Sequence, residues 1–152
     1  MKKYFKRLFK YNDWANQRIY ICIEENHITD EKIISHLSHM ISVEHIWLLR
    51  IRGLPTSPFP VWKNYSISEL DTMIMESKDN WEKYLEEHKM DTFEEMIFYT
   101  DSEGKKWENT INQIITHVIN HSTHHRGEIV RLLRERGIEV PQTDYLFYMR
   151  IR

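Results

Sequence analysis

Residues 109–136, NTINQIITHVINHSTHHRGEIVRLLRER, decide the fold class. At about 100° per residue, five apolar side chains fall within one helical sector roughly 60° wide: Ile111, Ile114, Val118, Ile129 and Leu132. Gly137 follows directly, and glycine is the residue that most often ends a helix. The stretch therefore predicts a long amphipathic helix with one face toward a core.

Three earlier stretches also have a helical period. From Lys2 to Asn26, apolar and small residues recur at spacings of three and four, with Asn12 as the polar member of the series. From Thr29 to Gly53 the apolar residues lie nearly all round, which indicates a helix buried on most sides. A third helix is expected from Ser66 to His88, because Ser66 and Glu69 match a capping box.

Two features of the first helix leave alternatives open. Asn12 on the apolar face either satisfies a buried partner or faces a pocket. A second apolar stripe could face a partner subunit or a further helix; it consists of Tyr4, Tyr11, Trp14 and Ile21.

The remaining segments complete the fold prediction. Residues 53–60 contain three prolines and are expected to form a loop, and residues 91–109 lose the helical period. Residues 137–152 are expected to form a strap, a segment that packs over the bundle. We predict an all-α fold: a four-helix bundle with a short hairpin or loop insertion before the last long helix. Residues 1–152 are expected to form a single domain.

Composition narrows the class of protein. A net charge of −2 gives no drive toward nucleic acid or anionic membranes, and no apolar run approaches membrane-spanning length. Cys22 is the only cysteine, so no disulfide forms within the chain, and a free thiol fits the reducing cytoplasm. The basic N-terminal residues are not followed by the apolar region of a signal peptide.

The histidines of the fourth helix point to a metal. By the same helical arithmetic His121 and His125 lie inside or beside the apolar sector, whereas His117 and His124 lie on its flank. Two core imidazoles need partners, which favours a metal site over a structural histidine cluster. A third ligand could come from the second helix, and its period does not choose among His36, His39 and His45.

Four stretches together resemble the DinB-like (DinB/YfiT) family of metal-binding four-helix bundles. They are residues 11–16 (YNDWAN), His39 with residues 47–50 (WLLR) and Gly53, residues 120–127 (NHSTHHRG) and residues 143–148 (TDYLFY). The resemblance implies a three-histidine site for a divalent ion, Zn or Ni, held by His39, His121 and His125. His39 matches the family's second-helix ligand because it precedes Trp47 by eight residues. Glu128 departs from the family's usual Gln, and its carboxylate could tune a ligand or simply be solvated.

The resemblance also implies a function. We expect a cytoplasmic homodimer that acts on a small-molecule substrate as a metal-dependent thiol S-transferase or hydrolase, with a low-molecular-weight thiol as partner and no nucleic acid or membrane. Asn12 and the tail aromatics would border the pocket, and Asp144 would hold a ligand imidazole from behind, or lie on a surface turn. The alternative is a non-catalytic bundle with a structural metal or histidine cluster, acting through dimer or partner assembly. With His39, His121 and His125 as the ligands that the resemblance implies, four other histidines are left as structural groups or as supports of the ligands: His36, His45, His117 and His124.

Overall fold

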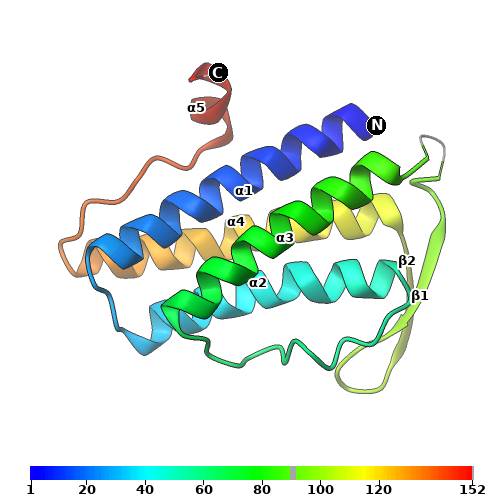
Figure 1. The fold of residues 1–152 in the computed structure, drawn as a ribbon, viewed down its shortest axis with the longest axis horizontal. Coiled ribbons are helices and arrows are strands. Elements are labelled where there is room, and N and C mark those ends of the chain that lie inside the picture. Colours follow the sequence, from blue (N-terminus) through cyan, green and yellow to red (C-terminus); the bar gives the residue numbers. More distant parts are fainter. Residues whose placement is uncertain (90–91, 152) are drawn as a thin grey trace.

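Four long helices form the bundle in the computed structural model, which describes residues 1–89 and 92–151: α1 (Lys2–Glu25), α2 (Glu31–Ile51), α3 (Ile67–Glu87) and α4 (Ile111–Glu135). α1 and α4 run in one direction and α2 and α3 in the other, because residues 52–66 return along the bundle between α2 and α3 (Figure 1). α1 packs against α3 and α4, and α2 packs against the same two helices. The prediction of an all-α bundle is confirmed.

Side-chain caps fix where three of the helices begin. Asp30 accepts hydrogen bonds from the backbone N–H groups of Lys32 and Ile33 at the start of α2. Ser66 and Glu69 form the predicted capping box of α3, and Thr110 and Gln113 form another at α4. Gly137, at φ 73°, ends α4 in the left-handed conformation that glycine adopts without steric cost.

The two larger apolar clusters of the core are separated by polar side chains, and a third, small cluster joins α1 to the tail. One larger cluster joins the end of α1 to the starts of α2 and α3 and the end of α4. The other joins the start of α1 to the ends of α2 and α3 and the start of α4. Between them each long helix contributes buried polar residues: Asn12, Asn16, His39, Glu44, Ser77, Ser122, His125 and Arg126. This arrangement defines a polar layer across the middle of the bundle.

The expected insertion is a hairpin. Strands β1 (Met96–Thr100) and β2 (Lys106–Thr110) pair antiparallel, with Met96 opposite Thr110, and contact α2 and α4. Asp91, where we expected the insertion to begin, lies outside the described residues, as does Arg152 at the end of the strap.

The tail contains a short helix that the sequence did not predict, α5 (Tyr145–Arg150). The ring of Tyr148 lies 5.7 Å from that of Tyr11 and 5.2 Å from that of Trp14, between centroids. A further helix therefore covers this part of the second apolar stripe on α1. Within the described residues, none of the helices has the length and apolar character needed to cross a membrane.

Candidate metal centre

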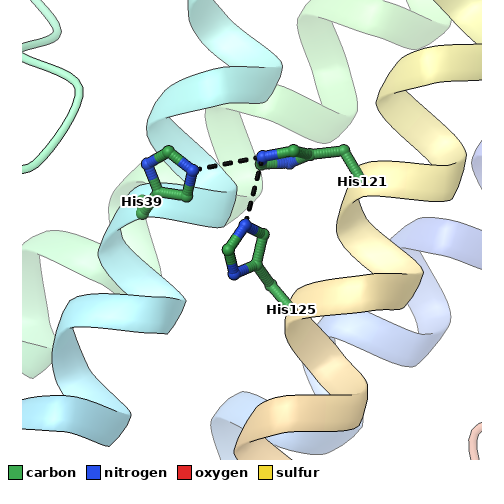
Figure 2. A group of neighbouring side chains, drawn as sticks. All are labelled: His39, His121 and His125. Atoms are coloured by element: carbon green, nitrogen blue, oxygen red, sulfur yellow. Dashed lines mark hydrogen bonds between the residues drawn. The ribbon is translucent and has the colours of Figure 1, made fainter.

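Three imidazoles from α2 and α4 meet inside the bundle, those of His39, His121 and His125 (Figure 2). The Nε2 atom of His121 lies 3.1 Å from Nε2 of His39 and 3.1 Å from Nε2 of His125. Each ring offers one ligand atom within 4.8 Å of the other two, and no other such cluster of His, Cys, Asp or Glu occurs among residues 1–89 and 92–151. The structure thus brings together the two inward histidines of the last long helix and the one chosen by the family resemblance.

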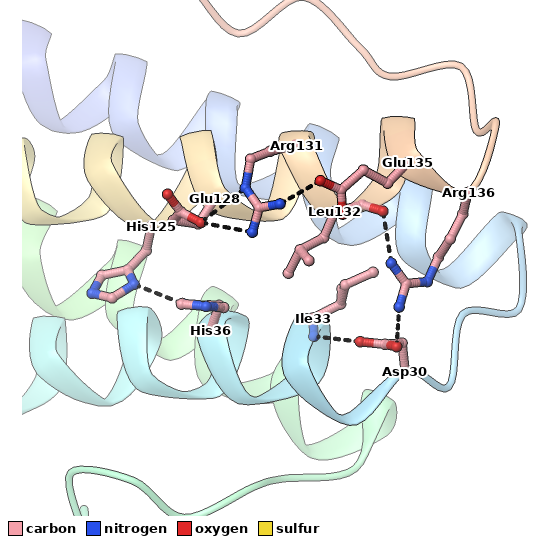
Figure 3. Close-up of polar contacts among 9 residues, drawn as sticks. All are labelled: Asp30, Ile33, His36, His125, Glu128, Arg131, Leu132, Glu135 and Arg136. Atoms are coloured by element: carbon pink, nitrogen blue, oxygen red, sulfur yellow. Dashed lines mark hydrogen bonds and ion pairs between the residues drawn. The ribbon is translucent and has the colours of Figure 1, made fainter.

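The opposite nitrogen of each ring shows how the rings are oriented. His39 Nδ1 lies 2.8 Å from the carbonyl oxygen of Val61, so it carries the proton and donates it, leaving the Nε2 lone pair toward the cluster. His125 Nδ1 lies 3.0 Å from His36 Nδ1 (Figure 3). His121 Nδ1 is buried and has no hydrogen-bond partner within residues 1–89 and 92–151.

These groups fit a divalent cation better than they fit one another. If Nδ1 carries the proton on His39 and His125, both rings present lone pairs toward His121, whose Nε2 has at most one proton to donate. That proton can pair with only one of the two lone pairs, so the other ring nitrogen would be left without a donor. Three imidazole nitrogens facing a common point are a donor set that suits zinc or nickel.

Electrostatics keeps the rings in the neutral, ligating form. Burial, followed by the neighbouring rings of His125 and His39, lowers the pKa of His121 to about 3. Burial and the nearby rings of His39 and His36 lower the pKa of His125 to about 4. Burial also lowers the pKa of His39, against the opposing hydrogen bond to Val61. At neutral pH all three lone pairs are therefore available, as metal ligation requires.

The loop between α2 and α3 shapes one side of the site, and sequence reasoning missed it. The indole of Trp62 stacks on the ring of His39, with centroids 3.8 Å apart and planes 6° apart, while 61% of Trp62 remains exposed. Val61 beside it supplies the carbonyl that orients His39. A proline-containing loop has no period that would predict such contacts, but its lone tryptophan was a usable signal.

The other candidate histidines have different places. His45 Nε2 lies 2.9 Å from the carbonyl oxygen of Met73, and its ring stacks on Phe59, so this histidine joins α2 to α3 and the loop. His117 and His124 are exposed on α4, as their flanking positions predicted. His36 contacts the ring of His125 at the nitrogen that faces away from the cluster.

A buried hydrogen-bond network beside the histidines was also missed. The Glu44 carboxylate, in a residue only 4% exposed, accepts hydrogen bonds from Asn12 (2.6 Å) and Asn16 (2.9 Å). It also accepts from Ser77 (2.7 Å) and Ser122 (2.9 Å), the latter adjacent in sequence to the candidate ligand at position 121. Donors from three other helices thus meet on this single side chain of α2.

Arg126 completes this network from the other side. Its guanidinium donates to the side-chain oxygens of both Asn12 and Asn16 at 2.7 Å. The two amides therefore connect a buried cation to the buried anion Glu44, which offsets the cost of burying each charge. Asn12 therefore has buried partners, and it also lines a cavity between α1 and α3.

The tail residues and Glu128 lie away from the three imidazole nitrogens that converge. Of the two alternatives for Asp144, the structure has the surface one: Asp144 is exposed, just before α5. Val61 and His36 occupy the Nδ1 sides of two of the ligand rings, and the third Nδ1 has no partner among the described residues. The tail aromatics pack on α1 rather than around the imidazoles. Glu128 pairs with Arg131 at 3.3 Å (Figure 3), so its carboxylate forms an ion pair on the surface of α4.

Comparison with known proteins gives one family. The family model described as "DinB family" matches residues 1–152. A relative from Bacillus subtilis (strain 168), "Protein DinB", is 25% identical over 171 aligned positions, which cover 98% of this chain and 95% of the relative.

Proposed function

The chain belongs to the DinB family, and we propose that it binds one divalent ion, zinc or nickel, through His39, His121 and His125 and acts as a metal-dependent thiol S-transferase or hydrolase. The observation that supports this proposal is the convergence of three Nε2 atoms without a fourth His, Cys, Asp or Glu ligand among the described residues. Structural zinc sites normally have four protein ligands, whereas catalytic sites have three and leave a position for water or substrate.

The position of His36 supports an open site. This is the next imidazole beside the cluster on α2, and its contact is with Nδ1 of His125 rather than with the converging Nε2 atoms. It therefore supports a ligand and does not close the coordination shell. This distinction favours the catalytic proposal over the structural alternative.

The chain's own groups would hold and orient the reactants. Val61 and His36 fix two ligand rings, and the stacked indole of Trp62 excludes water from one side of His39. A bound divalent ion would supply a lowered pKa for water or thiol and would polarise an electrophile.

The reacting thiol would come from outside the chain. Cys22 is 7% exposed, and burial raises the pKa of its thiol, so it is a poor source of thiolate. A low-molecular-weight thiol is therefore the cosubstrate that the proposal requires for S-transfer. We place the reaction in the cytoplasm, where such thiols stay reduced.

The test is an assay of thiol transfer to small electrophiles, and of hydrolysis of small esters and amides, by the metal-loaded protein. We expect activity that a chelator abolishes, that added metal restores, and that His121→Ala lacks. His124→Ala is the matched control on the exposed face of α4 and should retain activity. If chelation only lowers the melting temperature and every substrate is untouched, the metal is structural and the alternative is correct.

The proposed homodimer is tested separately. Exposed apolar side chains near the tail and on α1, including Tyr4 at 50%, Ile21 at 43% and Leu146 at 64% exposure, are available for self-association. Light scattering after gel filtration should give twice the chain mass of 18.7 kDa. A monomer mass at micromolar concentration would contradict the dimer without affecting the metal site.

A further inference from the structure

A cavity of about 420 Å³ opens between α1 and α3. Its lining comes from these two helices and from Glu44 of α2, and it contains no histidine. Each of α1 and α2 packs on both α3 and α4, so the α1–α3 and α2–α4 interfaces lie on opposite sides of the bundle. The cavity is therefore separate from the metal centre, with the polar layer between them.

One wall of the cavity is apolar and aromatic. The rings of Phe9 and Trp81 stack with centroids 4.3 Å apart, and Ile74 and Leu85 extend this wall along α3. Such a surface accommodates an apolar body of modest size, as small-molecule sites commonly do.

The floor is polar, but its charge is already compensated. Asn12, Asn16 and Ser77 line it and all donate to Glu44. The anion at Glu44 is balanced through the two amides by Arg126. The floor therefore has hydrogen-bonding atoms without requiring an added charge.

The wall carries one carboxylate without a partner. Asp13 lines the cavity and makes no hydrogen bond or ion pair within the described part of the chain. Two lysines that also line it are already paired, Lys6 with Glu86 and Lys10 with Glu82. Lys78 lines the same cavity on exposed α3 surface and forms no ion pair with Asp13 among the described residues. Burial raises the pKa of Asp13 to about 6, although Lys78 opposes the shift. A cationic ligand would relieve this desolvated charge.

We propose that the cavity binds a small amphipathic amine, with its protonated nitrogen on the Asp13 carboxylate and its apolar body against Phe9 and Trp81. An anion would face the carboxylates of Asp13 and Glu44, and a neutral apolar molecule would leave Asp13 unpaired beside a dry wall. Lys78, an exposed residue of the lining, would have to move away from the bound cation.

The test uses the ¹⁵N-labelled full chain and a matched pair of probes, 2-phenylethylamine and 2-phenylethanol. Trp81 donates its indole N–H to the backbone oxygen of Glu44 at 3.1 Å, so its indole signal reports on the cavity. Trp62 reports on the metal site in the same spectrum. We expect the amine to shift the Trp81 signal saturably while the Trp62 signal stays in place, and the alcohol to bind about tenfold more weakly or worse.

Two variants should change amine binding in opposite directions, and a third is the control. Asp13→Asn should weaken amine binding about tenfold or more, because a charge-assisted hydrogen bond is lost. Lys78→Gln should strengthen it by removing a competing cation, and Asp71→Asn, on the exposed surface of α3 outside the cavity lining, should leave it unchanged. Since gain and loss cannot both arise from misfolding, the set separates binding from stability.

Several results would overturn the proposal. They are the absence of a saturable Trp81 shift, equal binding of amine and alcohol, or wild-type affinity in Asp13→Asn. Weaker amine binding in Lys78→Gln would show that Lys78 does not compete with the bound cation and would also overturn it. None of these outcomes depends on metal at the histidines.

Discussion

The Nδ1 atoms of His36 and His125 lie 3.0 Å apart, which makes His36 the hydrogen-bond partner on the outer side of a candidate metal ligand. With Nδ1–H of His125 as donor, His36 accepts through its own Nδ1 lone pair, and Nε2 of His125 stays free for an ion. The relationship orients the ring and fixes its tautomer at the same time.

Replacing His36 by Ala should weaken zinc or nickel affinity about tenfold, the usual effect of losing a group that supports a ligand. Competition against a chromophoric chelator measures this. His124→Ala is the matched control, because its ring touches that of His125 with centroids 5.0 Å apart but makes no hydrogen bond to it among the described residues. Unchanged affinity in His36→Ala would show that the contact does not support the site.

Removing Glu44 should destabilise the bundle strongly. Glu44→Ala leaves four buried donors without their acceptor and the Arg126 cation without compensation. We expect the free energy of unfolding to fall by about 3–5 kcal/mol, measured by urea denaturation. Glu128→Ala removes only a surface pair and should cost less than about 1 kcal/mol. A similar small loss for both variants would contradict the role assigned to the polar layer.

Much of this fold was predictable, since period and capping determine where helices lie. The apolar sector of α4 also predicted that His121 and His125 face inward, because the geometry of a single helix suffices for that inference. The apolar side chains of α2 surround it, so its period could not single out His39, and the family resemblance supplied that choice.

The polar layer was harder to foresee because its partners are distant in the sequence. Asn12 was noticeable as a polar residue on an apolar face, but Glu44 lies in a helix buried on most sides and Arg126 within the histidine run. Asn12 and Asn16 are four residues apart, as are Ser122 and Arg126, and this spacing on two facing helices was the available signal. The contacts of Val61 and Trp62 depend on the path of the loop, which no local pattern encodes.

Asp13 should make the free energy of unfolding depend on pH. Its pKa is raised from 3.8 unfolded to about 6 folded, so the folded state holds the proton more tightly and ionisation destabilises it as pH rises from about 4 to 6. Asp13→Asn should therefore stabilise the protein above pH 6, by about 1 kcal/mol after discounting for partial solvent exposure. The gain should be mostly lost near pH 4, where the folded-state carboxyl is protonated and the unfolded-state carboxyl is about half protonated.

Urea denaturation of both proteins at pH 4 and pH 7.5 measures this difference. Asp13→Asn removes the carboxylate that is proposed to bind the amine. The free energy of unfolding should therefore rise while the affinity for the amine falls. A variant less stable than wild type at pH 7.5 would mean that Asp13 has a favourable partner in the folded protein.

The three-histidine centre is tested most directly by equilibrium titration of the metal-free protein with Zn²⁺ and Ni²⁺. We predict one tightly bound ion per chain, with affinity lowered about 100-fold or more in each of His39→Ala, His121→Ala and His125→Ala. His117→Ala, which removes an exposed imidazole from the same helix, should bind as wild type. Wild-type affinity in any of the three ligand variants, or no tight binding by the unaltered chain, would contradict the site.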